Sequence, residues 1–138
     1  MCGAVVAWGS RLQPTVALST MEAEYMSLCS ATQEVMFLRQ LLCELHIVLP
    51  RPTAMMEDNK GCIAFAKNSM TTSKSKHINV KLHFVRDAIS DGVIIMQWCS
   101  THDMIADILT EFSLSRHQHA RLASRMMPGC FSVSTSMI

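Results

Sequence analysis

The chain has 138 residues, a hydrophobic content of 49% and a formal net charge of +1 at pH 7. This length suits one domain with one core, and the near-neutral charge points to no particular class of partner. No apolar run approaches membrane-spanning length and the N-terminus lacks a signal-peptide pattern, so we expect an intracellular protein, cytoplasmic or nuclear, without a membrane partner. The six cysteines are scattered without a C-x-x-C pair, which favours reduced thiols over disulfides or a zinc site.

The sequence predicts an alternation of strands and helices. Short β-prone runs bounded by turn residues predict strands at 4–8, 53–57 and 93–99. Longer helical patterns predict helices at about 20–45, 60–67, 78–90 and 115–126, and a short helix through Leu109 that follows a capping box of Ser100 and Asp103. This order predicts an α/β layer fold. Pro128 and Gly129 break the pattern, so residues 128–138 are expected to form a disordered tail.

The longest helical pattern, at about 20–45, places one carboxylate on its apolar face. Ser19 and Glu22 have the spacing of a capping box, in which both side chains satisfy free N–H groups at the helix start. Glu24 is not part of this box. Residues spaced seven apart lie on the same face of a helix, and Leu38 and Leu45 follow Glu24 at multiples of seven, so Glu24 lies on the apolar face. A charge in such a place is costly unless it is paired or bound to a metal. Glu24 is therefore a candidate functional residue.

The sequence also carries a set of short motifs in a fixed order. They are Trp8–Ser10, Gln13–Thr20 and Glu22–Tyr25, followed by Glu57–Asn59, by Lys76–Ile78 with His83–Arg86, and by Ala106–Thr110. In order and spacing, over roughly residues 4–127, they resemble the ribonuclease H domain that ends copia-type retrotransposon polyproteins. Any one motif alone would be weak, whereas four groups in register form a specific signal.

The resemblance implies a fold and a boundary. Ribonuclease H domains have a mixed sheet of five strands in the spatial order 3-2-1-4-5, with flanking helices, and residues 4–8 would be the third strand. The first two family strands would precede residue 1, so we expect a sheet that lacks them. Residues 1–127 would then form a partial ribonuclease H-like domain.

The resemblance also implies a chemistry. Ribonuclease H enzymes cut the RNA strand of an RNA–DNA hybrid with two divalent ions, typically Mg²⁺, held by four carboxylates. The second, third and fourth of these carboxylates correspond to Glu24, Asp58 and Asp107, which would bind the metal ions and act in catalysis. The first would lie on the missing first strand. The implied partners are the hybrid and the rest of the polyprotein, including its reverse transcriptase.

Each of these three residues has a plainer interpretation. Glu24 could be one half of a partly buried salt bridge. Asp58 lies at the carboxyl end of a predicted strand, where α/β proteins place ligands, but it could also be a turn or cap residue beside Asn59. Asp107 could be a solvated helix position. Glu57 alternates away from Asp58 along the strand, so we expect it on the surface.

A cluster of basic residues between Lys60 and Arg86 is independent of the resemblance. This stretch has six lysines and arginines, two histidines and no acidic residue. The candidate nucleic-acid contacts are Lys60, Lys74, Lys76, His77, Lys81 and Arg86. Such a cluster suits a phosphate backbone, although an ordinary solvated surface explains it about as well.

Two hypotheses follow. The first is a fragment of a retrotransposon ribonuclease H domain, whose family activity is metal-dependent hydrolysis of RNA in RNA–DNA hybrids, and which is expected to be inactive alone. The second is a non-catalytic remnant that at most binds nucleic acid through residues 60–86.

Overall fold

The computed structural model of the chain describes residues 4–13, 16–68 and 76–128, with the backbone alone at 76–79. The chain divides into two compact units. The larger unit is Gln13–Cys99, and the smaller unit combines Met1–Leu12 with Ser100–Ile138. Within the described ranges, no helix has the length and apolar character that a membrane-spanning segment requires. The tail predicted at 128–138 lies, after residue 128, outside the described residues.

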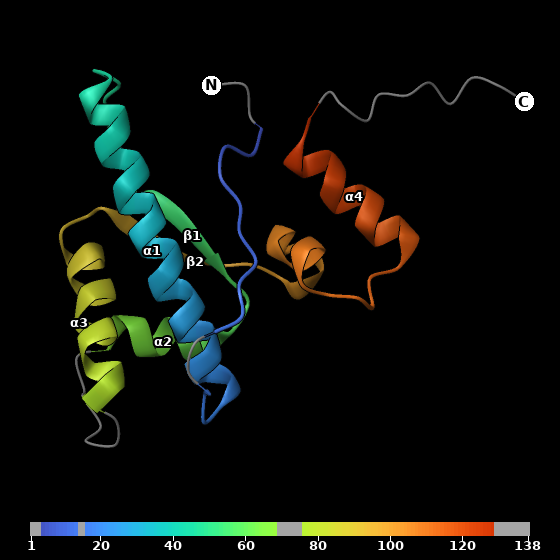
Figure 1. The fold of residues 1–138 in the computed structure, drawn as a ribbon, viewed down its shortest axis with the longest axis horizontal. Coiled ribbons are helices and arrows are strands. Elements are labelled where there is room, and N and C mark those ends of the chain that lie inside the picture. Colours follow the sequence, from blue (N-terminus) through green and yellow to red (C-terminus); the bar gives the residue numbers. More distant parts are fainter. Residues whose placement is uncertain (1–3, 14–15, 69–75, 129–138) are drawn as a thin grey trace, which may run out of the picture. The chain divides into compact units, whose positions relative to one another are not determined.

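The larger unit is a mixed α/β structure (Figure 1). Its described elements are, in chain order, α1 (Thr20–Glu44), β1 (Thr53–Glu57), α2 (Lys60–Lys67), α3 (Lys76–Ser90) and β2 (Ile94–Trp98). These elements confirm the α/β class and the helices and strands predicted between residues 20 and 99. Their boundaries differ from the predicted ones by at most two residues.

The two strands form a small parallel sheet. Thr53 pairs with Ile94, and the register runs without interruption to Glu57 opposite Trp98. Successive side chains point to opposite faces of a strand. Met55 and Glu57 are therefore buried together, whereas Met56 on the other face is 48% exposed.

The core of this unit lies where α1, α2 and α3 pack over the buried face of the sheet. Its best buried large side chains come from α1, α3 and the two strands: Tyr25, Leu28, Met55, Leu82, Val85, Ile94 and Met96. α2 adds the smaller side chains of Cys62 and Ala66. Only the first half of α1 takes part fully, because its buried residues all lie between Tyr25 and Thr32. The remaining turns of α1 are left half-buried or exposed.

Local capping signals explain where the elements begin and end. Ser19 Oγ accepts a hydrogen bond from the Glu22 N–H at 3.2 Å, and the Glu22 carboxylate accepts from the Leu18 N–H at 2.9 Å, which confirms the capping box. Asn59 Oδ1 likewise caps α2 by accepting from the Cys62 N–H at 3.1 Å. α3 ends at the predicted turn, where Gly92 adopts a φ of 69° that favours glycine.

The smaller unit is built around α4 (Arg116–Met126) and two short 3₁₀ helices, η1 (Thr101–Asp103) and η2 (Ile105–Leu109). Leu122 of α4 is completely buried. The predicted helix through Leu109 therefore exists as 3₁₀ turns, and the helix predicted at 115–126 is confirmed.

Asp103 pairs with α4 rather than capping a helix. Its Oδ1 lies 2.6 Å from Arg121 Nη1 and 3.4 Å from Arg125 Nη1. The hydrogen bond from Arg121 lowers the pKa of the Asp103 carboxyl. Ser100 makes no side-chain cap, so the predicted capping box is wrong, because the carboxylate that it needed is engaged by two arginines.

The strand predicted at 4–8 is not formed either. This stretch is extended, and its Val5 N–H donates to the Met126 carbonyl at 3.0 Å, but no strand pairs with it in the described chain. Val6 and Trp8 are 73% and 76% exposed. A β-prone composition becomes a strand only where a neighbouring strand supplies the ladder of hydrogen bonds, and the described part of the smaller unit contains no strand.

Candidate functional site

The turn between β1 and α2 holds the candidate Asp58 in a closed network of hydrogen bonds. The Asn59 N–H donates to Glu57 Oε1 at 3.0 Å, directly across Asp58. Asn59 Oδ1 accepts from the Cys62 N–H, and the Cys62 thiol in turn hydrogen-bonds the Glu57 carboxylate. The network fixes the backbone on both sides of Asp58, which lies half-buried at the carboxyl end of β1.

Glu57 corrects one of our expectations. It is only 6% exposed, whereas the alternation from Asp58 placed it on the surface. Asp58 follows the last residue of β1, so the alternation does not extend to it. Within the strand Glu57 shares the face of Met55, and that spacing of two residues was the signal for its burial.

Three carboxylates influence the pKa of the Cys62 thiol. The thiol is fully buried, and burial raises its pKa to about 12, with further contributions in the same direction from Glu57, Glu24 and Asp58. Glu24 of α1 and Asp58, the residue after β1, therefore both contribute to the raised pKa of this thiol. A thiol with so high a pKa stays protonated and is a poor nucleophile. Its role in this site is to pack in the core and to donate a hydrogen bond to the Glu57 carboxylate.

Glu57 makes the stability of the larger unit depend on pH. Burial is the main cause that raises the pKa of its carboxyl, and Asp58 adds to it, whereas the bonds from Asn59 and Cys62 oppose it. A raised folded-state pKa stabilises the fold below the ordinary glutamate pKa, and that contribution is lost as the pH rises through the folded value.

We therefore expect Glu57→Gln to flatten the pH dependence of the unfolding free energy above the ordinary glutamate pKa. The amide keeps the shape and can still accept from the Asn59 N–H, but it carries no charge. Urea unfolding at a series of pH values measures the effect, with the exposed Glu34→Gln as the matched control. Parallel curves for wild type and Glu57→Gln would contradict the expectation.

Asp107 lies in the smaller unit, so the geometry of this site involves only Glu24 and Asp58 of the three predicted metal ligands. Its backbone carbonyl accepts from the Thr110 and Glu111 N–H groups at the end of η2. Glu24 and Asp107 are both half-buried. Among the described residues, no group of three or more His, Cys, Asp or Glu side chains is arranged to hold a metal ion.

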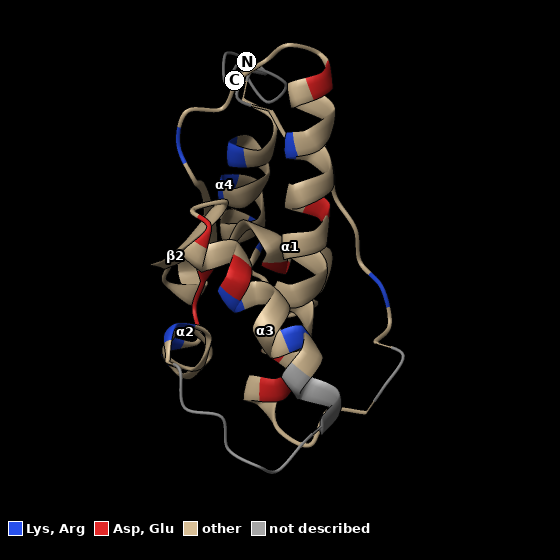
Figure 2. Ribbon diagram, turned by 90° about the vertical axis from the view of Figure 1, so that its left-hand side faces the viewer, with Lys and Arg blue, Asp and Glu red and all other residues tan. Residues whose placement is uncertain are grey.

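The basic residues between 60 and 86 have different surroundings (Figure 2). The Lys60 ammonium lies 5.1 Å from the centre of the Trp98 ring, an exposed cation–π contact. Arg86 turns inward instead, because its Nη2 donates to the Phe65 carbonyl at 2.9 Å and its guanidinium lies over the Phe65 ring. Lys81 is half-buried on α3.

The side chains of the other three predicted nucleic-acid contacts are not among the described residues. Lys74 lies outside the described residues, and Lys76 and His77 begin α3 with only their backbone described. Their contact with nucleic acid stays a prediction. Sequence reasoning missed Trp98, although an aromatic residue at the end of a predicted strand near a lysine-rich stretch was a usable signal.

Comparison with known proteins gives one consistent result. The chain is 36% identical over 121 residues to the "Retrovirus-related Pol polyprotein from transposon RE1" of Arabidopsis thaliana, covering 88% of this chain and 8% of that protein. The homologues of this chain are retrovirus-related Pol polyproteins. Those of transposon RE2 of Arabidopsis thaliana and transposon TNT 1-94 of Nicotiana tabacum are 36% and 35% identical over 77% and 79% of this chain.

The match covers a small share of each Pol polyprotein. The aligned part amounts to 7–8% of the length of these relatives. No family model matches the chain. No solved structure matches it either. The chain therefore belongs to the retrovirus-related Pol polyproteins, and it spans only a small part of their length.

Proposed function

We propose that residues 4–127 are part of the ribonuclease H domain of a transposon Pol polyprotein. The observation that carries the proposal is the 36% identity to a Pol polyprotein over 88% of the chain. The ordered motifs around Glu24, Asp58 and Asp107 support the choice of this domain within the polyprotein. The parallel pair β1–β2 also suits it, because strands 4 and 5 are neighbours in the order 3-2-1-4-5.

The donor set supports a partial metal site. Carboxylate oxygens are the ligands that Mg²⁺ prefers, and the charges of Glu24 and Asp58 both raise the pKa of the Cys62 thiol. When bound, a pair of Mg²⁺ ions would activate water and stabilise the leaving oxygen. The sequence supplies three of the four carboxylates that the resemblance implies, of which Glu24 and Asp58 lie in the larger unit. Two carboxylates do not complete a two-metal site, and we assign no hydrolytic step to this chain.

The purified chain is expected to cut an RNA–DNA hybrid at or near the background rate. An incomplete ligand set weakens the second metal in particular, and two-metal hydrolysis needs both ions. The measurement is cleavage of a labelled hybrid in Mg²⁺ or Mn²⁺. Asp58→Asn tests the proposed ligand, and the exposed Asp87→Asn on α3 is its matched control.

If the wild-type chain cut the hybrid robustly, Asp58→Asn abolished the cutting and Asp87→Asn retained it, three carboxylates would be sufficient for hydrolysis. This result would support the ribonuclease H assignment while overturning the expected inactivity. A ribonuclease H assignment would itself be refuted if cleavage were robust and insensitive to Asp58→Asn, Glu24→Gln and Asp107→Asn alike.

The second candidate function is nucleic-acid binding without catalysis. The observation that favours it is the absence of any acidic residue from Lys60 to Arg86. Four of the six lysines and arginines in this stretch have described side chains, and all four lie at exposed or half-buried positions of α2 and α3. Contacts of this kind read the phosphate backbone and not the base sequence. The partner would be an RNA–DNA hybrid or another nucleic acid, with reverse transcriptase as a neighbour in the parent polyprotein.

Binding is expected to be weak, independent of sequence and sensitive to salt. Each phosphate contact contributes roughly 0.9 to the slope of log affinity against log salt. Replacing Lys74, Lys76 and Lys81 with Ala should therefore lower that slope by up to about 3. Fluorescence anisotropy titrations at several salt concentrations measure it, with the exposed Arg11→Ala and Arg51→Ala as controls. An unchanged slope would assign these lysines to a surface without nucleic acid.

A further inference from the structure

The larger unit exposes one aromatic ring to which the proposed function gives no role. Trp98 is the last residue of β2 and shares the strand face of Ile94 and Met96, which are only 1% and 4% exposed. Trp98 is nevertheless 54% exposed. The strand therefore ends beyond the core and leaves much of the indole ring in solvent.

This ring lies at the carboxyl ends of both strands. Trp98 is the register partner of Glu57, the residue before the candidate Asp58. α2 then begins at Lys60, whose exposed ammonium lies 5.1 Å from the centre of the Trp98 ring. Sheets of α/β proteins bind their ligands at the carboxyl ends of parallel strands. An aromatic ring and a cation are thus exposed together where a ligand is expected.

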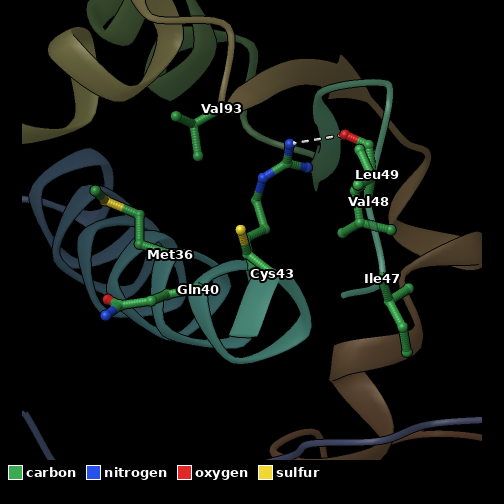
Figure 3. Close-up of a pocket in the computed structure, with 8 residues that line it drawn as sticks. Met36, Gln40, Cys43, Ile47, Val48, Leu49 and Val93 are labelled. Carbon is green, nitrogen blue, oxygen red and sulfur yellow. Dashed lines mark hydrogen bonds between the residues drawn. The ribbon is translucent and has the colours of Figure 1, made fainter. Parts of the chain in front are cut away.

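The amino ends of the strands have a different surface in the described structure. A groove lies there between the second half of α1 and the loop after it, and Val93, just before β2, lines it (Figure 3). Among its described lining residues, Arg39 carries the one positive charge. Arg39 Nη1 donates to the Arg51 carbonyl and to Thr53 Oγ1, each at 3.0 Å. Its Nη2 donates to the Leu49 carbonyl at 3.4 Å. Because protein oxygens engage this guanidinium, the groove suits a phosphate less well than Lys60 does.

A nucleotide base can replace the Lys60 ammonium on the Trp98 ring. An exposed cation–π contact is favoured by roughly two- to fivefold, whereas a base stacked on an aromatic side chain adds roughly five- to 150-fold in affinity. The ammonium ends a flexible four-carbon side chain, so it can move from the ring to a neighbouring phosphate. The exchange therefore replaces one weak contact with a stacked base and a phosphate contact.

We propose that Trp98 and Lys60 bind an unpaired nucleotide of a nucleic-acid strand. The base stacks on the indole ring, and the adjoining phosphate contacts the Lys60 ammonium. The base has to be unpaired, because neighbouring base pairs already cover both of its faces within a duplex. Every base has a face that can stack, so the contact is independent of sequence. The inference rests on the proposed nucleic-acid binding and adds to it the site and the single-stranded state of the ligand.

The first test follows the fluorescence of Trp98 itself. The chain has two tryptophans, so Trp8→Phe leaves Trp98 as the only one. We expect an oligothymidylate of about 15 nucleotides, long enough for one binding site, to quench Trp98 along the same saturation curve as its binding. Trp98→Phe, in which only Trp8 remains, is the matched control. It should show no saturable quenching, although Trp8 is 76% exposed.

The second test measures affinity by fluorescence anisotropy of the labelled oligothymidylate. Trp98→Leu should weaken binding by roughly five- to 150-fold with an unchanged salt slope, because stacking releases no counterions. Trp98→Phe keeps a ring and should lose much less. Lys60→Ala should instead lower the slope of log affinity against log salt by about 0.7, the contribution of one phosphate contact on a single strand. Phe112→Leu is the matched control, since Phe112 is fully exposed in the smaller unit, and it should leave the affinity unchanged.

Three results would overturn the proposal, each in a different way. If the wild-type chain bound the oligothymidylate while Trp98→Leu kept its affinity and Trp98 kept its fluorescence, this site would be wrong and nucleic-acid binding would stand. If Trp98→Leu lost as much affinity for a fully paired RNA–DNA hybrid, the ring would contact a duplex and not an unpaired base. A chain that bound neither probe would refute the proposed nucleic-acid binding, and this inference with it.

Discussion

Tyr25→Ala is expected to remove a large part of the stability of the larger unit. Tyr25 is 1% exposed and joins all three helices of this unit. Its ring packs edge-on against Phe65 of α2 with centroids 5.2 Å apart, and its hydroxyl donates to the Leu82 carbonyl of α3 at 3.2 Å. Removing the ring leaves a cavity where α1 meets its two neighbours.

The expected cost is about 3–5 kcal/mol, as for other buried aromatic side chains truncated to alanine. Small domains have only about 5–15 kcal/mol of stability, and a two-stranded sheet contributes little of its own. Circular dichroism in urea measures the loss. Tyr25→Phe is the matched control, because it keeps the ring and removes one hydrogen bond worth about 0.5–1.5 kcal/mol. Equal losses for the two variants would mean that the hydroxyl and not the ring holds the helices together.

Met55→Pro is expected to destroy the sheet, whereas Met56→Pro is tolerated much better. The Thr53 N–H donates to the Val93 carbonyl at 2.9 Å, and the Glu57 carbonyl accepts from the Cys99 N–H at 3.0 Å. Alternate residues of a parallel strand bond the same neighbour, so the N–H of Met55, between them, also points at β2. The Met56 N–H points to the opposite edge, where the described sheet has no third strand.

Proline removes the N–H in both variants, but only Met55→Pro removes a ladder bond. Met55→Ala is the second control, because it removes the buried side chain and keeps the N–H. The unfolding free energy of Met55→Pro should lie roughly 1–3 kcal/mol below that of Met55→Ala, the cost of an unmade buried hydrogen bond. Chemical denaturation measures all three variants. If Met56→Pro were the more damaging one, the register of β1 would be shifted by one residue.

The beginnings and ends of the elements were predictable because local signals determine them. Ser19 and Asn59 each accept a hydrogen bond from an N–H three residues later, which needs no distant part of the chain. Gly92 ends α3 through a backbone conformation that other residues rarely adopt. The position of Asp58 at the end of β1 followed from the same local reasoning.

The sequence pointed to Glu24 and Asp58, whose metal binding stays a prediction, but it did not reveal the side chains that surround Asp58. The motifs placed Glu24 and Asp58, but the network that holds Asp58 runs through Glu57 and Cys62. The scattered Cys62 carries no signal of its own, and only the two-residue spacing from Met55 indicates that Glu57 is buried. Their roles arise from burial, which lets the carboxylate accept from the Asn59 N–H and from the thiol instead of from water.

The sequence by itself determined the N-terminal caps of α1 and α2, the strands at 53–57 and about 93–99, and the relation to Pol polyproteins, because each depends on neighbouring residues or on residue identity. Only the tertiary structure decided which apolar and charged side chains are covered. Residues 4–8 have strand composition but no partner strand in the described chain. Arg86 turns toward Phe65, whereas Phe37 remains in solvent. Ladder pairing, burial and exposure depend on which distant elements come together, and the periodicity of a single element does not contain that information.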